Sequence, residues 1–148
     1  MTRKHLNQDA RAIIDLSNAI AREYELEYVG TEHILLAILR HGQGVGAAAL
    51  QQLKVTEPKT AREVQQLNER AKEDTWVFGR LPGSPHYLNV IERAQELSEE
   101  LESDEIGSEH ILLALFQDHD SAAYQILHNL GVNSRICRGA VQKLLGKN

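Results

Sequence analysis

Apolar residues recur every three or four positions in two stretches of the chain, with polar residues between them. The first series is Leu6, Ala10, Ile13, Ile20 and Tyr24, with the small residue Ser17 at the intervening position, and the second is Val90, Ala94, Leu97 and Leu101. This spacing places the apolar side chains of each stretch on one face of an α-helix. The pattern therefore predicts two amphipathic helices, each with one face turned toward a core.

Between and after these stretches, a segment of the chain repeats itself. Residues 30–39 return almost unchanged as residues 107–116, at a constant offset of 77 positions. The two segments read GTEHILLAIL and GSEHILLALF, and seven of the ten residues are identical. The same offset aligns apolar positions elsewhere without a gap, such as Leu50 with Leu127. The chain is therefore a duplicated unit.

The start of each repeated segment predicts a second helix. Thr31 and Ser108 follow a glycine and precede an aliphatic run. At such a position a side-chain hydroxyl can accept a hydrogen bond from an unpaired backbone N–H at the start of its own helix. Because the run that follows is almost wholly aliphatic, this helix is expected to be largely buried in both units.

Turn residues indicate a short third helix in each unit. Three glycines within 42–46 break the chain before residues 47–53, and residues 118–121 do the same before residues 122–130. The glycine-rich turn also resembles a dinucleotide-binding loop, but it follows a predicted helix rather than a strand. We therefore interpret it as a helix-to-helix connection.

Capping residues mark the other helix starts. Thr56 and Asn133 are typical N-caps for a fourth helix in each unit. Ser84 precedes Pro85, and a good N-cap followed by proline at the first helical position fixes the start of the second unit's opening helix.

These signals predict an all-α fold of eight helices and give no convincing strand. The helices form two tandem four-helix repeats related by pseudo-twofold symmetry. With 148 residues, the chain has the usual length of a single domain. We expect one domain over 1–148, with repeat one at about 5–71, a linker at about 72–83 and repeat two at about 84–146.

The predicted linker is unusually rich in large apolar side chains. It holds Trp76, Phe78 and Leu81, although its sequence breaks the helical pattern. These groups either pack over the seam between the repeats or form a patch that faces a partner.

The net charge of the chain limits the classes of partner that it is expected to bind. Lys and Arg total 16 against 21 Asp and Glu, for a net charge of −5, so non-specific nucleic-acid binding is not expected. No Lys or Arg lies between Arg93 and Arg135, whereas nine acidic residues, including Glu105, do. This acidic stretch is either a solvated helix face and loop or a surface that attracts cationic groups.

Compartment and membrane signals are few. Cys137 is the only cysteine, so no intramolecular disulfide can form, and it is expected to be a small core residue. The charged first residues lack the apolar segment of a secretory signal. The longest aliphatic run, Ile34–Leu39, is too short to span a bilayer. We expect a cytoplasmic protein that is monomeric in isolation.

Catalytic and metal-binding motifs are not found. A nucleotide-binding loop needs a Gly-x-x-x-x-Gly-Lys sequence with a following hydroxyl, and the only Gly-Lys pair is Gly146-Lys147, which lacks both. The seven histidines form neither Glu-x-x-His nor His-x-x-x-His spacing, so no helix presents two ligands on one face. We therefore expect no metal, no cofactor and no enzymatic activity.

The repeated Gly-Thr/Ser-Glu-His sequence is the candidate binding site. The helix start offers free N–H groups and a hydroxyl to an anion, beside a carboxylate that can take a guanidinium or ammonium. The four candidates are Thr31, Glu32, Ser108 and Glu109. A carboxylate in the first helical turn is also explained by the helix dipole alone. His33 and His110 are expected to point inward as hydrogen-bonded core residues.

The repeated GTEHILLA and GSEHILLA sequences, Ser84-Pro85 and the turn at Leu130-Gly131-Val132 resemble the N-terminal domain of bacterial Clp ATPases. The resemblance covers roughly residues 5–146 and is greatest for the ClpC and ClpA branch. It implies a mobile domain on an AAA+ unfoldase, which captures substrates and adaptor proteins for delivery to the ClpP peptidase.

In the ClpC branch, the resemblance further implies recognition of phosphoarginine. Glu32 and Glu109 would hold the guanidinium, with Thr31 and Ser108 next to the phosphate. Trp76, Phe78 and Glu105 are candidates for a partner surface. The alternative is a free-standing regulator or adaptor that binds the Clp machine itself, with the ATPase modules in trans.

Overall fold

The turn and cap signals correspond to eight α-helices in the computed structural model, which describes residues 5–25, 29–73 and 85–146. The helices are α1 (Gln8–Glu23), α2 (Thr31–His41), α3 (Gly44–Gln52), α4 (Glu57–Glu73), α5 (Pro85–Glu100), α6 (Ser108–Ala114), α7 (Ala122–Asn129) and α8 (Ser134–Leu144). The described residues form no strand, which confirms the all-α prediction. None of these helices combines the length and the apolar character that crossing a bilayer would need.

The predicted N-caps of the fourth helices are present. The Thr56 hydroxyl accepts a hydrogen bond from the Lys59 N–H at 3.3 Å. The Asn133 side chain accepts one from the Ile136 N–H at 2.8 Å. Each bond satisfies a backbone donor that has no partner inside its own helix.

The third helix of the first repeat begins earlier than predicted. Gly42 adopts the left-handed conformation, with φ of 69°, and ends α2 as glycine commonly does after a helix. α3 then starts at Gly44 rather than at Ala47. Gly46 therefore lies inside a helix and not in the turn.

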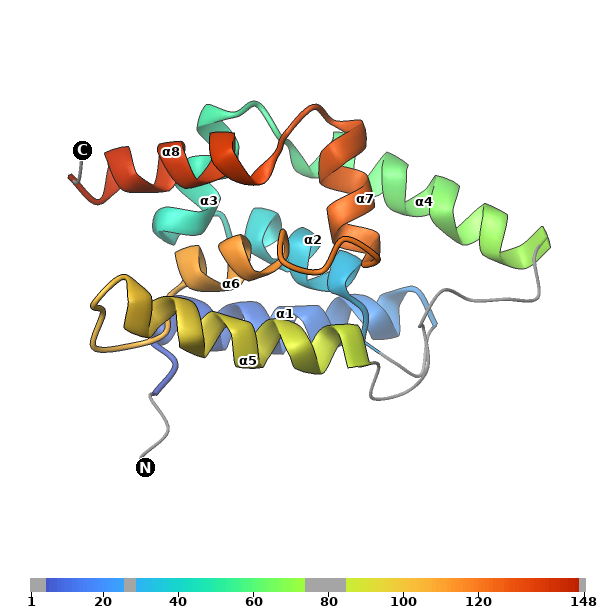
Figure 1. Cartoon of the computed structure of the whole chain (residues 1–148). Helices are drawn as coiled ribbons and strands as arrows, with labels where there is room; N and C mark the ends of the chain where they lie inside the picture. The colour runs from blue at the N-terminus through green and yellow to red at the C-terminus, as the bar shows by residue number, and fades with distance from the viewer. Residues whose placement is uncertain (1–4, 26–28, 74–84, 147–148) are drawn as a thin grey trace.

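The helices lie in three layers (Figure 1). α2 and α6 run through the middle, α1 and α5 lie on one side of them, and α3, α4, α7 and α8 lie on the other. The central parts of the middle helices are buried on every face, since Ile34–Ile38 and Ile111–Leu115 are at most 2% exposed. The prediction that the second helix of each unit is largely buried is confirmed.

The two repeats interlock through their third helices. α3 belongs to the first repeat but packs on α6 of the second, and α7 of the second repeat packs on α2 of the first. α1 and α5 each pack on the middle helix of their own repeat. Each buried middle helix is therefore covered by helices from both halves of the chain.

The ends of the two middle helices differ. In the first repeat, Arg40 near the end of α2 bonds Glu23 of α1 at 2.8 Å and Glu57 of α4 at 3.1 Å. In the second repeat, the residue equivalent to Arg40 is Gln117, 77 positions later. At Gln117 the chain is no longer in α6. It follows turns with hydrogen bonds between residues three positions apart, and the Gln117 N–H donates to the Ala114 carbonyl at 3.0 Å.

Two further features concern the segments around the helices. Leu6 and Ile106 form an isolated parallel bridge, which fixes the start of the first repeat to the α5–α6 connection of the second. α4 continues to Glu73, into the segment predicted as linker. Ser84, Trp76 and Phe78 lie outside the described residues.

Candidate functional site

The repeated sequence forms the same helix start twice. Gly30 and Gly107 are the N-cap residues of α2 and α6. The His33 ring accepts a hydrogen bond from the Gly30 N–H through Nδ1 at 2.8 Å, and His110 does the same with Gly107 at 2.8 Å. Both histidines are at most 1% exposed. The predicted inward, hydrogen-bonded histidines are confirmed.

The motif glutamates lie against the motif glycines. A Cβ atom placed on Gly30 would overlap the Glu32 carboxylate, and one on Gly107 would overlap the carboxylate of Glu109. Each glutamate therefore folds back over the glycine two residues before it, and a larger residue at the glycine position would make the carboxylate move. Glycine, glutamate and histidine act as one packed unit at each helix start.

The motif hydroxyls bond across the boundary between the repeats. The Thr31 hydroxyl accepts a hydrogen bond from the Ala123 N–H of α7 at 3.0 Å. The Ser108 hydroxyl accepts one from the Gly46 N–H of α3 at 2.9 Å. Ala123 and Gly46 lie in the first turns of their helices, where backbone donors lack intrahelical partners.

The expectation that these hydroxyls cap their own helices is therefore wrong. Glycine takes the N-cap position, so Thr31 and Ser108 are the first helical residues and their side chains reach the neighbouring helix. The first repeat caps a helix of the second, and the second repeat caps a helix of the first.

Burial limits what the four candidate binding residues can reach. Thr31, Glu32 and Ser108 are 2%, 1% and 1% exposed, whereas Glu109 is partly exposed. Their backbone and hydroxyl groups serve the contacts between helices. Of the four, Glu109 presents the most surface to a ligand.

The other candidates are placed as follows. Glu105 is exposed in the α5–α6 connection. Cys137 is fully buried, as predicted, and burial raises the pKa of its thiol to about 12, with Arg138 acting in the opposite direction. In the described ranges, no three His, Cys, Asp or Glu side chains gather closely enough to hold a metal ion.

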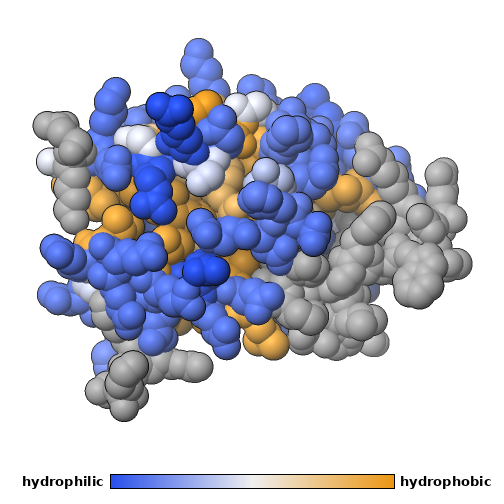
Figure 2. Space-filling model, viewed as in Figure 1, coloured by the Kyte–Doolittle hydropathy of each residue, from blue (hydrophilic) through white to orange (hydrophobic). Residues whose placement is uncertain are grey.

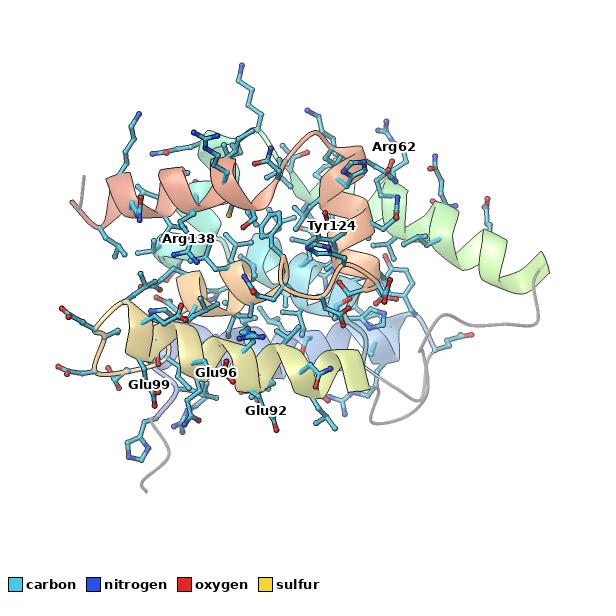
Figure 3. All side chains as sticks on the ribbon, viewed as in Figure 1. Arg62, Glu92, Glu96, Glu99, Tyr124 and Arg138 are labelled. Atoms are coloured by element: carbon cyan, nitrogen blue, oxygen red, sulfur yellow. The ribbon has the colours of Figure 1, made fainter. Side chains whose placement is uncertain are left out.

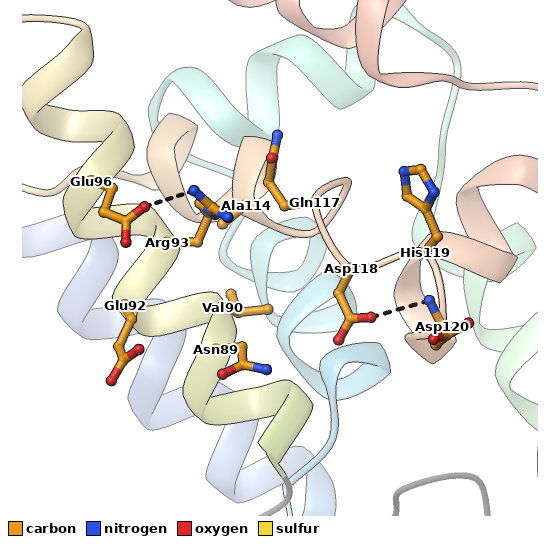
Figure 4. Close-up of a pocket in the computed structure, with 10 residues that line it drawn as sticks. All are labelled: Asn89, Val90, Glu92, Arg93, Glu96, Ala114, Gln117, Asp118, His119 and Asp120. Carbon is orange, nitrogen blue, oxygen red and sulfur yellow. Dashed lines mark hydrogen bonds and ion pairs between the residues drawn. The ribbon is translucent and has the colours of Figure 1, made fainter.

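Sequence reasoning missed a groove beside α5. It has a volume of about 530 Å³ and lies between α5 and residues 117–120, which connect α6 to α7 (Figure 4). Glu92, Glu96 and Asp118 are among the residues that line it. The stretch without Lys or Arg was the available signal, but the approach of residues 117–120 to α5 depends on how α6 ends.

Comparison with known families gives a match over nearly the whole chain. Residues 5–147 match the family described as Clp repeat (R) N-terminal domain. Chaperone protein ClpB of Oceanobacillus iheyensis is 35% identical over 139 residues, which are 94% of this chain and 17% of that protein. The negative regulator of genetic competence ClpC/MecB of Bacillus subtilis is 34% identical over 139 residues, again 94% of this chain and 17% of that protein.

Solved structures share the fold. The N-terminal domain of the caseinolytic protease associated chaperone ClpD from Arabidopsis thaliana aligns with a TM-score of 0.74 and 22% identity, over 99% of this chain and 97% of that one. The Hsp104 N-terminal domain from Candida albicans aligns with a TM-score of 0.71 and 15% identity, over 98% and 94% of the two chains. At these identities the likeness concerns the arrangement of helices.

Proposed function

The chain belongs to the family of Clp repeat N-terminal domains, and from this premise we propose that it is a non-catalytic domain that captures substrate or adaptor proteins for a Clp unfoldase. The family match carries the proposal, because it covers residues 5–147 and so includes both copies of the repeated motif. We place the domain in the cytoplasm.

Most of the motif side chains are taken up by contacts inside the domain, and this supports a role in which surface residues bind proteins. Thr31 and Ser108 hold helices together, and His33 and His110 close the helix starts. These buried polar groups of the motif therefore build the fold. Binding falls to the residues that reach the surface, which are the exposed helix faces and the partly exposed Glu109. This arrangement suits recognition of proteins rather than chemistry on a small substrate.

The ATPase part of the system is expected to lie elsewhere. The chain spans about a sixth of the length of the curated relatives it matches, with 17% coverage of ClpB and of ClpC/MecB. The unfolding and ATP hydrolysis that we propose downstream of capture are therefore assigned to AAA+ modules, joined to this domain or acting in trans.

The chain immobilised on a resin tests capture. Bound proteins are identified by mass spectrometry, and each is then assayed as a substrate of the Clp unfoldase and peptidase of the same organism. We expect captured proteins that are degraded in an ATP-dependent manner, or adaptors that promote such degradation. If the Clp ATPase itself is the main protein retained, the domain is instead a regulator of the machine.

Phosphoarginine is the finer specificity that we propose for the motif glutamates. The two glutamates differ in how accessible they are to a ligand. Glu109 is partly exposed to solvent, whereas Glu32 is 1% exposed. Calorimetric titration should show binding of free phosphoarginine but not of arginine, with a greater loss in Glu109→Ala than in Glu32→Ala. No heat from phosphoarginine in the unmodified chain would exclude this specificity.

A further inference from the structure

The groove beside α5 continues along that helix. A second hollow of about 230 Å³ lies next to the first and is lined by Glu92, Gln95, Glu96 and Glu99. Glu92 and Glu96 line both hollows. The two hollows adjoin, the second being lined by α5 side chains alone, and together we call them the α5 groove.

The α5 groove is strongly acidic. Five carboxylates line it: Glu92, Glu96, Glu99, Asp118 and Asp120. Figure 3 shows Glu92, Glu96 and Glu99 projecting from α5. The basic side chains in the lining are His119 and Arg93, and Arg93 pairs with Glu96 at 2.6 Å.

Part of the lining is apolar. Val90 and Ala114 line the wider hollow and are each 1% exposed. Figure 2 shows hydrophobic residues in a band between the hydrophilic groups on this face. The surface that the groove offers to a ligand is therefore mainly that of its charged and polar walls, because neighbouring residues cover the apolar side chains beneath them.

The first repeat serves as an internal control for these charges. The residues 77 positions before the five carboxylates are Asp15, Ala19, Arg22, His41 and Gln43. Only one of them is acidic, yet the first repeat forms the corresponding helices. The acidic lining is therefore not required by the fold. Like charges four residues apart on a helix, such as Glu92 and Glu96, even destabilise it.

We propose that the α5 groove binds an extended, basic segment of a partner protein. This inference rests on the proposed capture function and names the chemistry of one captured segment. From Asn89 to Glu99 the helix rises about 15 Å, at 1.5 Å per residue. An extended peptide covers that distance with about five residues. Alternate residues of such a peptide point to the same side, so Lys or Arg at every second position would face the carboxylates.

Two other charged ligands, a metal ion and a nucleic acid, fit the α5 groove less well than a basic peptide. A metal ion needs several ligands around one point, and the described carboxylates form no such cluster. A nucleic acid would be repelled by the net charge of the groove. Charges spread along a groove match charges spread along a peptide.

Fluorescence anisotropy with a defined peptide tests the proposal. The probe is a capped (Lys-Ser)3 peptide that carries a neutral dye, and the same peptide with acetylated lysines is the control probe. The proposal predicts saturable binding of the lysine probe, weakened by added salt, and no binding of the acetylated one. Equal binding of both probes would contradict it.

Two matched variants locate the binding. The groove variant combines Glu92→Gln, Glu96→Gln and Asp118→Asn. The control variant, Glu100→Gln, Glu102→Gln and Asp104→Asn, removes the same charge from exposed positions outside the groove. We expect about tenfold weaker probe binding in the groove variant, as for the loss of three modest ion pairs, and less than a twofold change in the control. Equal losses in both variants would overturn the proposal.

The capture experiment separates this inference from the proposed function. Both variants are immobilised beside the unmodified chain, and circular dichroism verifies that each is folded. Loss of basic captured proteins from the groove variant alone supports the inference. If the groove variant retains every captured protein that is degraded, the proposed function stands and the α5 groove does not carry it.

Discussion

At the scale of single residues, close contacts decide which positions must be glycine. A Cβ atom added to Gly46 would lie 2.9 Å from the backbone oxygen of Ser108, and the Gly46 N–H already donates to the Ser108 hydroxyl. The contact is with backbone, so α3 and α6 would have to move apart. Gly139 in α8 has no neighbour within 4 Å of such an atom.

These two glycines give a matched prediction for stability. Gly46→Ala should lower the free energy of unfolding by about 1–3 kcal/mol, the usual cost of overpacking. Gly139→Ala should raise it by roughly 0.5–1 kcal/mol, because alanine loses less backbone entropy in a helix. Urea unfolding of both variants measures the difference. Similar effects of the two substitutions would show that α3 and α6 do not approach so closely.

The buried thiol of Cys137 makes stability depend on pH. Its pKa is raised from 9.0 to about 12 in the folded protein because burial disfavours the thiolate. Between these values only the unfolded chain releases the proton, so the unfolded state binds fewer protons. Stability should therefore fall above pH 9, by up to about 1.4 kcal/mol per pH unit.

Urea unfolding between pH 8 and 10.5, with Cys137→Ala as the reference, isolates this effect from other groups that titrate there. The unmodified chain should lose stability more steeply than the variant above pH 9. Parallel profiles for the two proteins would mean that the thiol titrates alike in the folded and unfolded states.

At the scale of helices, polar bonds between repeats supplement the apolar packing. Thr31 caps α7, and Ser108 caps α3. Thr31→Val should destabilise the domain by about 1–3 kcal/mol, because the buried Ala123 N–H loses its acceptor. Thr31→Ser keeps the hydroxyl and serves as the control in thermal or urea unfolding. Equal stability of the valine and serine variants would argue against the cross-repeat bond.

Helix positions follow from the sequence where the signals are local. Thr56 and Asn133 could be predicted as caps, since each bonds a residue three positions later. The partners of Thr31 and Ser108 could not, because they lie 92 and 62 positions away. The start of α3 was missed because glycine marks both turns and close helix contacts, and only the packing of Gly46 on α6 separates these cases.

At the scale of the whole molecule, duplication predicted the number and order of helices but not how the halves meet. A constant offset of 77 positions relates the two repeats, yet the third helix of each packs on the other. The α5 groove was beyond prediction for a similar reason. Its wall at residues 117–120 forms where α6 ends sooner than α2, a difference between nearly identical segments.

The central claim is that this domain captures proteins for an unfoldase, and competition tests it most directly. The isolated chain is titrated into a degradation assay that contains the Clp unfoldase and peptidase of the same organism and one captured substrate. The account predicts that the chain raises the substrate concentration needed for half-maximal degradation and leaves the maximal rate unchanged. Unaltered degradation at a saturating excess of the chain would contradict the account.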